Sequence, residues 1–445
     1  MSDIIHRKKR LSSFRTIVLG FAGVILLGAI ILMLPVSSRS GVVTPFNEAL
    51  FTSTSAVCVT GLVVHDTGSY WSVFGQAVIL LLIQIGGLGV VTIAVFVAML
   101  SGKKISLMQR STLQDAISAP SVGGIVRITR FILCGTALIE LSGMLLMLPV
   151  FCRDYGAKGI WMSLFHSVSA FCNAGFDILG TKENPFSSLT GYVANPLINI
   201  VVMLLIIVGG IGFFTWNDVY MHKLRFKKYS LQTKVVLTTT LILIVVPAAL
   251  YFIFDFSDAP LGRRTLEAMF QSVTPRTAGF NTVDLNAMTS SSKAIMIILM
   301  LVGGSPSSTA GGMKTTTLAV LVLNLFSTFR KKENSEVFDR RIDNSVVKNA
   351  ATIFMMYCSL FFIGGLVICT VEGIGLIECL FETASAVGTV GLTLGITPNL
   401  GLASQIILIV LMFLGRVGGL TFVYATVAAK RKNGAKYPLE KITVG

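Results

Sequence analysis

Four short glycine turns carry main-chain groups that could bind a cation. They read VTGLV, NAGFD, TAGFN and TVGLT, and their glycines (Gly61, Gly175, Gly279 and Gly391) recur roughly every 110 residues, as in an internal repeat. Extended turns can direct carbonyl oxygens inward, and a ring of such oxygens can replace the hydration shell of a cation. Glycine suits this position because it tolerates backbone angles that other residues avoid. The alternative is that each glycine is only a tight turn in a packed helical hairpin.

A related short helix precedes each turn. The four helices read ALFTSTSAVC, SLFHSVSAFC, AMFQSVTPRT and CLFETASAVG, and they share a phenylalanine followed by serine or threonine at recurring offsets. The C-terminal end of a helix carries partial negative charge, which would favour a cation at the turn. These helices are too short to cross a membrane, so we predict re-entrant loops. Irregular backbone at membrane depth must be buried in protein or line a watery cavity.

The composition indicates a polytopic membrane protein. Of the 445 residues, 53% are hydrophobic and 13% are charged, and the mean hydropathy is +0.79. Stretches such as Thr16–Val36 and Ala403–Ala429 reach the roughly 20 residues that cross ~30 Å of hydrocarbon as a helix. With two crossings per repeat, we predict an all-α polytopic fold of eight transmembrane helices. They form four repeats of first span (M1), pore loop and second span (M2), with pseudo-fourfold symmetry around one central pore.

The predicted boundaries follow the turns and the polar linkers between the repeats. Repeat 1 covers 1–100, repeat 2 covers 101–228, repeat 3 covers 229–332 and repeat 4 covers 333–429. A C-terminal tail, 430–445, follows the last repeat and is expected in the cytoplasm.

The basic residues gather on one side of this arrangement. The net charge is +15, and most of the 36 lysines and arginines fall in the N-terminal segment, the linkers between repeats and the tail. Because positively charged loops stay in the cytoplasm, we predict a multi-pass protein of the cell membrane with both termini cytoplasmic. The clusters fit orientation signals and anionic-lipid contacts better than a nucleic-acid site. The seven cysteines lie singly and predict neither a disulfide framework nor a metal site.

Each M2 span carries a glycine motif at one depth below its turn, starting at Gly86, Gly209, Gly303 and Gly415. In repeat 3 the span would be roughly 50 Å long as one helix, and its middle, GGSPSSTAGGMK, disfavours helix. We predict a break and an intramembrane loop, 303–314, that lines the pathway and moves as a gate. The alternative is a kinked helix with small residues for close packing. The predicted gating residues are Gly303, Gly304, Ser305, Pro306, Ser307, Ser308, Thr309, Ala310, Gly311, Gly312, Lys314 and Arg416.

Two of these residues carry a positive charge within apolar spans. A charged side chain at membrane depth is costly and normally faces the protein interior or water. The guanidinium of Arg416 would repel a permeating cation and could hold the loop closed through its carbonyls. A structural ion pair or a snorkelling side chain is the alternative. For Lys314, snorkelling to the cytoplasmic interface and pairing within the pore both stay open.

The repeats, turns and motifs together resemble the Ktr/Trk/HKT superfamily of potassium transporters over nearly the whole chain. VTPRTAGFNTVD and the broken third M2 are the most specific parts of this resemblance. The resemblance implies a potassium-selective, ion-translocating subunit for K⁺ uptake, gated by the intramembrane loop, because all four filter positions are glycine. It places K⁺ at the carbonyls of Thr60, Ala174, Ala278 and Val390. The implied filter residues are Val59, Thr60, Gly61, Asn173, Ala174, Gly175, Thr277, Ala278, Gly279, Thr389, Val390 and Gly391.

The same resemblance implies the partners. It predicts a homodimer with one pore in each protomer, and a cytoplasmic ring of nucleotide-binding, KtrA-like regulatory subunits. K⁺ is the expected transported ion, with Na⁺ as a stimulating or coupled ion and no covalent cofactor. Membrane lipid is the other expected partner, and nucleic acid is not expected.

Two further groups of residues bear on the rival functions. An enzyme is not expected, because the four histidines lie in separate regions and no HExxH motif is present. A sodium or ammonium transporter of similar architecture is the alternative function. Asp66, Asp177 and Asp284 shortly follow their glycines, and they would either concentrate cations at the entrance or be solvated loop charges. Arg276 is expected behind the filter, bonded to backbone carbonyls.

Overall fold

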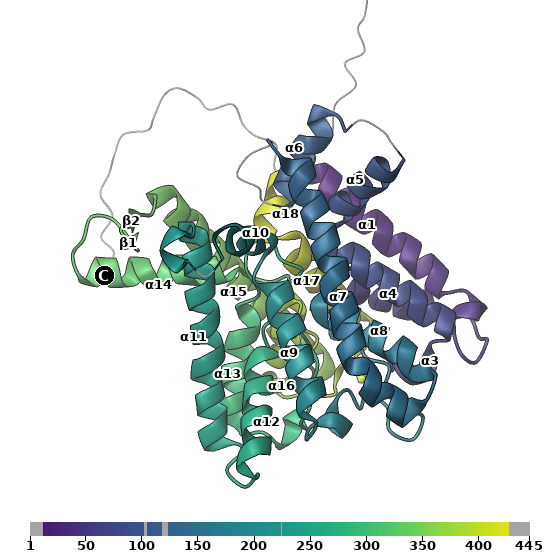
Figure 1. The fold of residues 1–445 in the computed structure, drawn as a ribbon. Helices are drawn as coiled ribbons and strands as arrows, with labels where there is room; N and C mark the ends of the chain where they lie inside the picture. The colour runs from purple at the N-terminus through teal and green to yellow at the C-terminus, as the bar shows by residue number, and fades with distance from the viewer. Residues whose placement is uncertain (1–11, 102–104, 118–122, 224, 427–445) are drawn as a thin grey trace, which may run out of the picture.

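The computed structural model describes residues 12–101, 105–117, 123–223 and 225–426. The predicted tail, 430–445, and the first residues of predicted repeat 1 lie outside this part of the chain. Within it the fold is almost entirely helical (Figure 1), with one small antiparallel hairpin. The element order long helix, short helix, glycine turn, apolar helix and final helix occurs four times along the chain.

The helices and strands have the following bounds. The first segment contains α1 (Ser13–Leu32), η1 (Pro35–Ser37), α2 (Phe46–Val57), α3 (Thr67–Tyr70), α4 (Val73–Leu88), α5 (Val90–Leu100) and α6 (Leu107–Ala116). The second contains α7 (Ile125–Tyr155), α8 (Lys158–Phe171), η2 (Thr190–Tyr192), α9 (Pro196–Gly210), α10 (Phe213–His222) and η3 (Phe226–Lys228). The third contains α11 (Leu231–Phe254), α12 (Leu261–Val273), η4 (Leu285–Ala287), α13 (Ser290–Leu301), α14 (Thr315–Phe329), β1 (Glu336–Val337) and β2 (Arg340–Arg341). The fourth contains α15 (Asn344–Glu372), α16 (Leu376–Gly388), η5 (Thr397–Asn399), α17 (Leu402–Val417) and α18 (Gly419–Thr426).

Long apolar helices form the frame of the molecule. Among the described residues, α1, α7, α11 and α15 are long and apolar enough to cross a membrane. The bent pairs α4–α5 and α9–α10 bring the number to six if each pair is one span, and α13, α14 and α17 are apolar but shorter. The eight crossings expected from the sequence therefore stay a prediction.

The short helices α2, α8, α12 and α16 are inside this frame. Each packs against the long helix that precedes it. Their C-terminal halves are buried, as in α2, where every residue from Phe51 to Val57 is buried, and α16, where every residue from Phe381 to Gly388 is buried. A helix whose end is buried on every side must have that end inside the protein core. The fold thus holds the four turns at its centre.

The second spans are bent, which corrects the expectation of a single helix over Ala403–Ala429. There, α17 ends at Val417, and Gly418 turns the chain into α18 with φ +85°. The pair α4–α5 bends by 96° at Gly89, and α9–α10 bends by 97° near Gly212. Both glycines have positive φ, which glycine adopts without the penalty of a Cβ. In the third segment a longer loop separates α13 from α14, which runs across the end of α11 (Figure 1).

Candidate ion pathway

The four predicted filter turns have positive φ at the same two positions. In each turn, the glycine and the residue two positions before it have positive φ. Positive φ is rare for residues other than glycine, and such strain persists only where the surrounding structure holds it. The non-glycine residues are Val59 (57°), Asn173 (57°), Thr277 (69°) and Thr389 (53°), and the glycines are Gly61 (94°), Gly175 (69°), Gly279 (77°) and Gly391 (93°).

Serine and threonine hydroxyls of the short helices hold these turns. The Gly61 N–H donates to Ser55 Oγ at 3.0 Å, and the Gly391 N–H donates to Ser385 Oγ at 3.0 Å. In the other two turns the hydroxyl is the donor, from Ser169 Oγ to the Phe176 carbonyl at 2.6 Å and from Thr274 Oγ1 to the Phe280 carbonyl. Each turn is thus hydrogen-bonded to a hydroxyl at the end of the short helix that precedes it. The recurring Ser/Thr offsets in the sequence were the signal for them.

The four glycines lie next to one another in a closed cycle. A Cβ placed on Gly61 would lie 2.5 Å from the Ala174 carbonyl oxygen, and one on Gly175 would lie 2.8 Å from that of Ala278. A Cβ on Gly279 would meet the Val390 carbonyl oxygen, and one on Gly391 would meet that of Thr60. Each turn therefore touches the next, and the fourth touches the first. There is no room for a side chain at any of the four glycines.

The oxygens in this cycle are the four carbonyls expected to bind the ion. Among the described residues, the carbonyls of Thr60, Ala174, Ala278 and Val390 accept no hydrogen bond from the protein. A buried carbonyl without a donor is unusual and calls for a partner. All twelve predicted filter residues are buried, and the structure brings them to one place.

The loop between α13 and α14 packs against the glycine motifs of the other second spans. The Ser305 N–H donates to the Gly210 carbonyl at 2.9 Å, and the Thr309 N–H donates to the Gly209 carbonyl at 3.2 Å. The Gly312 N–H donates to the Gly415 carbonyl at 3.1 Å. Main-chain bonds to two other segments thus fix a loop that has no regular secondary structure of its own.

The Arg416 side chain hydrogen-bonds the loop and also the end of α4 in the first segment. Its guanidinium donates to the Thr309 carbonyl of the loop, to the Gly86 carbonyl at 2.5 Å and to the Gly87 carbonyl at 2.9 Å. No acidic side chain pairs with Arg416 in the part of the chain that the structure describes. The contact with a loop carbonyl is the one made to Thr309, and an ion pair is not found among the described residues. The role of Arg416 as a barrier stays a prediction.

Lys314 also bonds the loop. Its Nζ donates to the Ala310 carbonyl at 2.7 Å and to the Gly311 carbonyl at 3.3 Å. Of the two alternatives left open by the sequence, this arrangement is the pairing within the protein. Both cations of the predicted gating set therefore end on carbonyl oxygens, which are the groups that a permeating cation would also use.

A cavity of about 300 Å³ adjoins the loop. Its lining comes from the loop, from the bends of α4–α5 and α17–α18, and from the C-terminal end of α6. Of the predicted gating residues, those in the lining are Pro306, Ser307, Ser308, Ala310, Gly312, Lys314 and Arg416. The loop thus borders a cavity as well as the glycine motifs.

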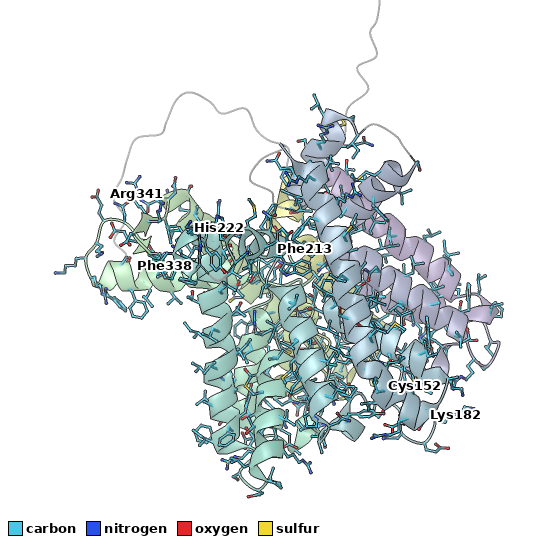
Figure 2. The ribbon with its side chains drawn as sticks, viewed as in Figure 1. Cys152, Lys182, Phe213, His222, Phe338 and Arg341 are labelled. Carbon is cyan, nitrogen blue, oxygen red and sulfur yellow. The ribbon has the colours of Figure 1, made fainter. Side chains whose placement is uncertain are left out.

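The tip of the loop has contacts that sequence reasoning missed. Ser307 Oγ donates to the carbonyl of Ile117 at the end of α6, and the Phe213 N–H donates to the Ser307 carbonyl at 2.7 Å. Figure 2 labels Phe213 at the start of α10, toward the same end of the molecule as Arg341, and Cys152 and Lys182 at the opposite end. The sequence could not predict these two bonds, because the acceptor in each is a main-chain carbonyl, which every residue has.

The acidic residues near the turns have structural partners. The Asp66 carboxylate accepts from the Ser69 N–H at 2.7 Å and from the Phe186 N–H at 2.9 Å, and Asp284 accepts from the Asn286 N–H at 2.9 Å. Asp177 lies in the loop between α8 and α9, outside the membrane-spanning helices. Burial, and then the charge of Asp66, raise the pKa of Asp177 to about 7. These carboxylates thus cap loops as well as adding negative charge.

Arg276 is buried, as expected, but its guanidinium bonds no carbonyl of the described residues. Its Nη2 donates to Thr240 Oγ1 at 3.4 Å, and its Nε has no partner among the described residues. The expectation of carbonyl contacts for this side chain was therefore wrong.

Comparisons with known proteins show the family of this chain. Residues 12–434 match the TrkH family, described as "Cation transport protein". The chain is 40% identical to the Potassium/sodium uptake protein NtpJ of Enterococcus hirae, over 98% of both chains. It is 38% identical to the Ktr system potassium uptake protein B of Bacillus subtilis, over 100% of this chain and 99% of that one. The crystal structure of the potassium transporter TrkH from Vibrio parahaemolyticus has the same fold, with a TM-score of 0.74, 18% identity and coverage of 95% of this chain and 86% of that one.

The family match and the apolar helices thus define a membrane-embedded cation transport protein rather than an enzyme. The chain belongs to the TrkH family, within the Ktr/Trk group that its sequence resembled.

Proposed function

We propose that this chain is the potassium-selective, ion-translocating subunit of a K⁺ uptake system. K⁺ passes the cycle of turns, where the carbonyls of Thr60, Ala174, Ala278 and Val390 replace its water. The observation that carries this proposal is the mutual approach of the four glycines and these carbonyls. Relatives named as potassium uptake proteins support the choice of ion.

Potassium is preferred over sodium because all four turns have glycine at the filter position. A side chain at one glycine would overlap the next turn and narrow or distort the ring. A sodium or ammonium transporter of the same architecture is the alternative, and one relative is named for both potassium and sodium. Na⁺ is retained as a stimulating or coupled ion.

The loop 303–314 is the gate in this proposal. It bonds the glycine motifs of the second and fourth segments, and Arg416 bonds it to the first segment. Opening requires these bonds to break and the loop to move into the adjoining cavity. Arg416 and Lys314 raise the barrier for a cation by placing positive charge beside the pathway.

The membrane arrangement and the partners follow from the same proposal. Four repeats with the predicted boundaries give eight crossings with pseudo-fourfold symmetry, in the plasma membrane, with both termini in the cytoplasm. Each protomer of a homodimer has its own pore. Relatives belong to a "Ktr system", which supports an assembly with further subunits such as a KtrA-like ring. The exposed, basic hairpin at Arg340 and Arg341 is a surface available to such a ring.

Growth rescue of a potassium-uptake-deficient strain tests the function. The wild-type chain should restore growth at low K⁺, and Gly61→Ser should lose the preference for K⁺ over Na⁺ because the new side chain meets the Ala174 carbonyl. Gly23→Ser is the matched control, since a Cβ on Gly23 meets nothing within 4 Å. Equal K⁺ preference in Gly61→Ser and Gly23→Ser, at equal expression, would exclude the filter role.

A further inference from the structure

Glu140 is a carboxylic acid buried at the middle of a membrane-spanning helix. It lies in α7 (Ile125–Tyr155), and 8% of the residue is exposed. About 15 residues separate it from each end of the helix, which places it roughly 22 Å from either end. No lysine, arginine or histidine pairs with it among the described residues. An ionisable residue in this setting calls for a functional explanation.

Its side-chain partners are neutral and come from two other elements. Gln84 Nε2 of α4 donates to Glu140 Oε2 at 3.2 Å. Cys172 Sγ, at the end of α8, lies 3.4 Å from Gln84 Oε1 and 3.9 Å from Glu140 Oε1. Cys172 directly precedes the second filter turn, and Gln84 lies two residues before Gly86, whose carbonyl accepts from Arg416. The three side chains therefore connect a filter turn with the anchor of the gating loop.

An internal comparison shows that packing does not require a carboxyl group here. Ser167 Oγ of α8 donates to the main-chain carbonyl of Glu140 at 2.6 Å. The equivalent serines of α2 and α12 donate to the carbonyls of Ile25 at 2.7 Å and Ile244 at 2.5 Å. Both isoleucines are buried. The same position of the same helix pair is thus apolar in two segments and acidic in one.

Gln84 is exceptional in the same way. Two residues before the glycine motif, the other three second spans have apolar residues, namely Ile207, Leu301 and Phe413. The acid and the amide that bonds it are therefore both polar where the rest of the chain is apolar. Because both Glu140 and Gln84 are polar where the other segments are apolar, we infer that the pair has a function beyond packing.

The surroundings decide what the carboxyl group binds. An ionised carboxylate without a counter-charge is costly in an apolar interior. A metal ion would need several oxygen ligands, and among the described residues the one other side-chain oxygen in this cluster is Gln84 Oε1. A proton needs none, and a protonated carboxyl group accepts from the Gln84 amide through its carbonyl oxygen.

We propose that Glu140 is a proton-binding site, and that transport is fast while it holds its proton and slow once the proton is lost. This inference rests on the proposed function. Loss of the proton leaves a bare charge between the second filter turn and the end of α4. The Gln84 and Cys172 side chains then reorganise around that charge, which disturbs the turn and the Gly86 and Gly87 carbonyls that hold Arg416.

Other titratable groups on the neighbouring elements do not contact the carboxyl group. Neither α4 nor α9 contains an acidic, basic or histidine residue. In α8, Lys158 lies at the far start of the helix, and His166 Nδ1 is bonded to the Met162 carbonyl at 2.7 Å. In α6, Arg110 and Asp115 flank Leu113, which clusters with Ile125 and Ile132 near the start of α7. In α10, which contacts α7 through Tyr220 and Phe131, Asp218 and His222 bond each other. Cys172 is the one titratable side chain in contact with Glu140 in this part of the structure.

Flux in liposomes tests the proposal. The full-length protein is reconstituted, and uptake of ⁸⁶Rb⁺ at saturating concentration is measured with the same pH on both sides. The wild-type maximal rate should fall by up to about tenfold per pH unit above the midpoint, as for one proton. Glu140→Gln and Glu140→Ile should lack this alkaline fall, since the first imitates the protonated acid and the second reproduces Ile25 and Ile244. A wild-type profile identical to that of Glu140→Gln would overturn the proposal.

An infrared measurement tests it without transport. At a pH where the wild type is active, its spectrum should contain the C=O band of a protonated carboxylic acid that is missing from Glu140→Gln. Absence of that band would overturn the proton site. If the band is present while wild-type liposomes take up no Rb⁺ at any pH, the proposed function and the transport role of Glu140 fail, and the proton site itself stands.

Discussion

The Arg416 guanidinium donates to the Thr309 carbonyl, which ties the end of α17 to the loop between α13 and α14. The same guanidinium reaches the Gly86 and Gly87 carbonyls at the end of α4. One side chain therefore joins three segments that are far apart in the sequence. Its partners are all carbonyl oxygens, and under the proposed function these are acceptors that a passing cation would otherwise meet.

Replacing Arg416 should speed transport. Arg416→Ser removes a positive charge from the pathway and frees the loop, and a barrier lowered by about 1.4 kcal/mol gives a tenfold higher rate. We expect ⁸⁶Rb⁺ uptake to rise by roughly that factor. Arg416→Lys keeps the charge but loses the forked donor, so it should give a smaller increase.

Arg15→Ser is the control for this prediction. Arg15 Nε also donates to a main-chain carbonyl, that of Ala425 at 2.8 Å, but it joins α1 to α18 away from the loop. Its replacement should leave the rate close to that of the wild type. Unchanged uptake by Arg416→Ser, at normal expression, would count against the barrier.

Shortening the loop should also increase flux. Deletion of Ser305–Ala310 removes the segment that bonds Gly209, Gly210 and Arg416, while α13 and α14 keep their own helical bonds. Uptake and surface expression are measured together in the same cells. A deletion variant that is expressed normally and transports more slowly than the wild type would contradict the gate.

Acidification should weaken the apparent affinity for K⁺. The pKa of Asp177 is raised to about 7, so this carboxyl group is charged above that pH and neutral below it. As the pH falls from 8 to 6, the entrance loses negative charge and the KM for Rb⁺ should rise. Asp177→Asn should have the higher KM at every pH. A wild-type KM that stays constant over this range would rule out a role for Asp177.

The bends of the second spans illustrate which parts of the fold the sequence could not predict. The long Gly-, Ser- and Pro-rich stretch of the third span indicates an interruption by composition alone. GGLG, GGIG and GRVGG are short and flanked by apolar residues, so hydropathy predicts continuous spans there. One glycine with positive φ is enough to turn the chain by nearly a right angle.

The sequence predicted the features of the candidate site that occur in all four segments, and it did not predict the contacts that occur only once. The turns recur four times, so their glycines and the serine and threonine residues that hold them stand out in the sequence. The bond from Ser307 to the Ile117 carbonyl and the pair Glu140–Gln84 occur once each, and they join residues distant along the chain. Only the packed helices bring such residues together.

The central claim is that the carbonyls of Thr60, Ala174, Ala278 and Val390 surround a dehydrated cation. Anomalous diffraction from crystals of transport-active protein grown in Rb⁺ locates that ion directly. The account predicts an anomalous peak on the common axis of the four turns, within coordination distance of these oxygens, that is lost in Gly391→Ser. A transport-active protein whose Rb⁺ peaks all lie elsewhere would contradict it.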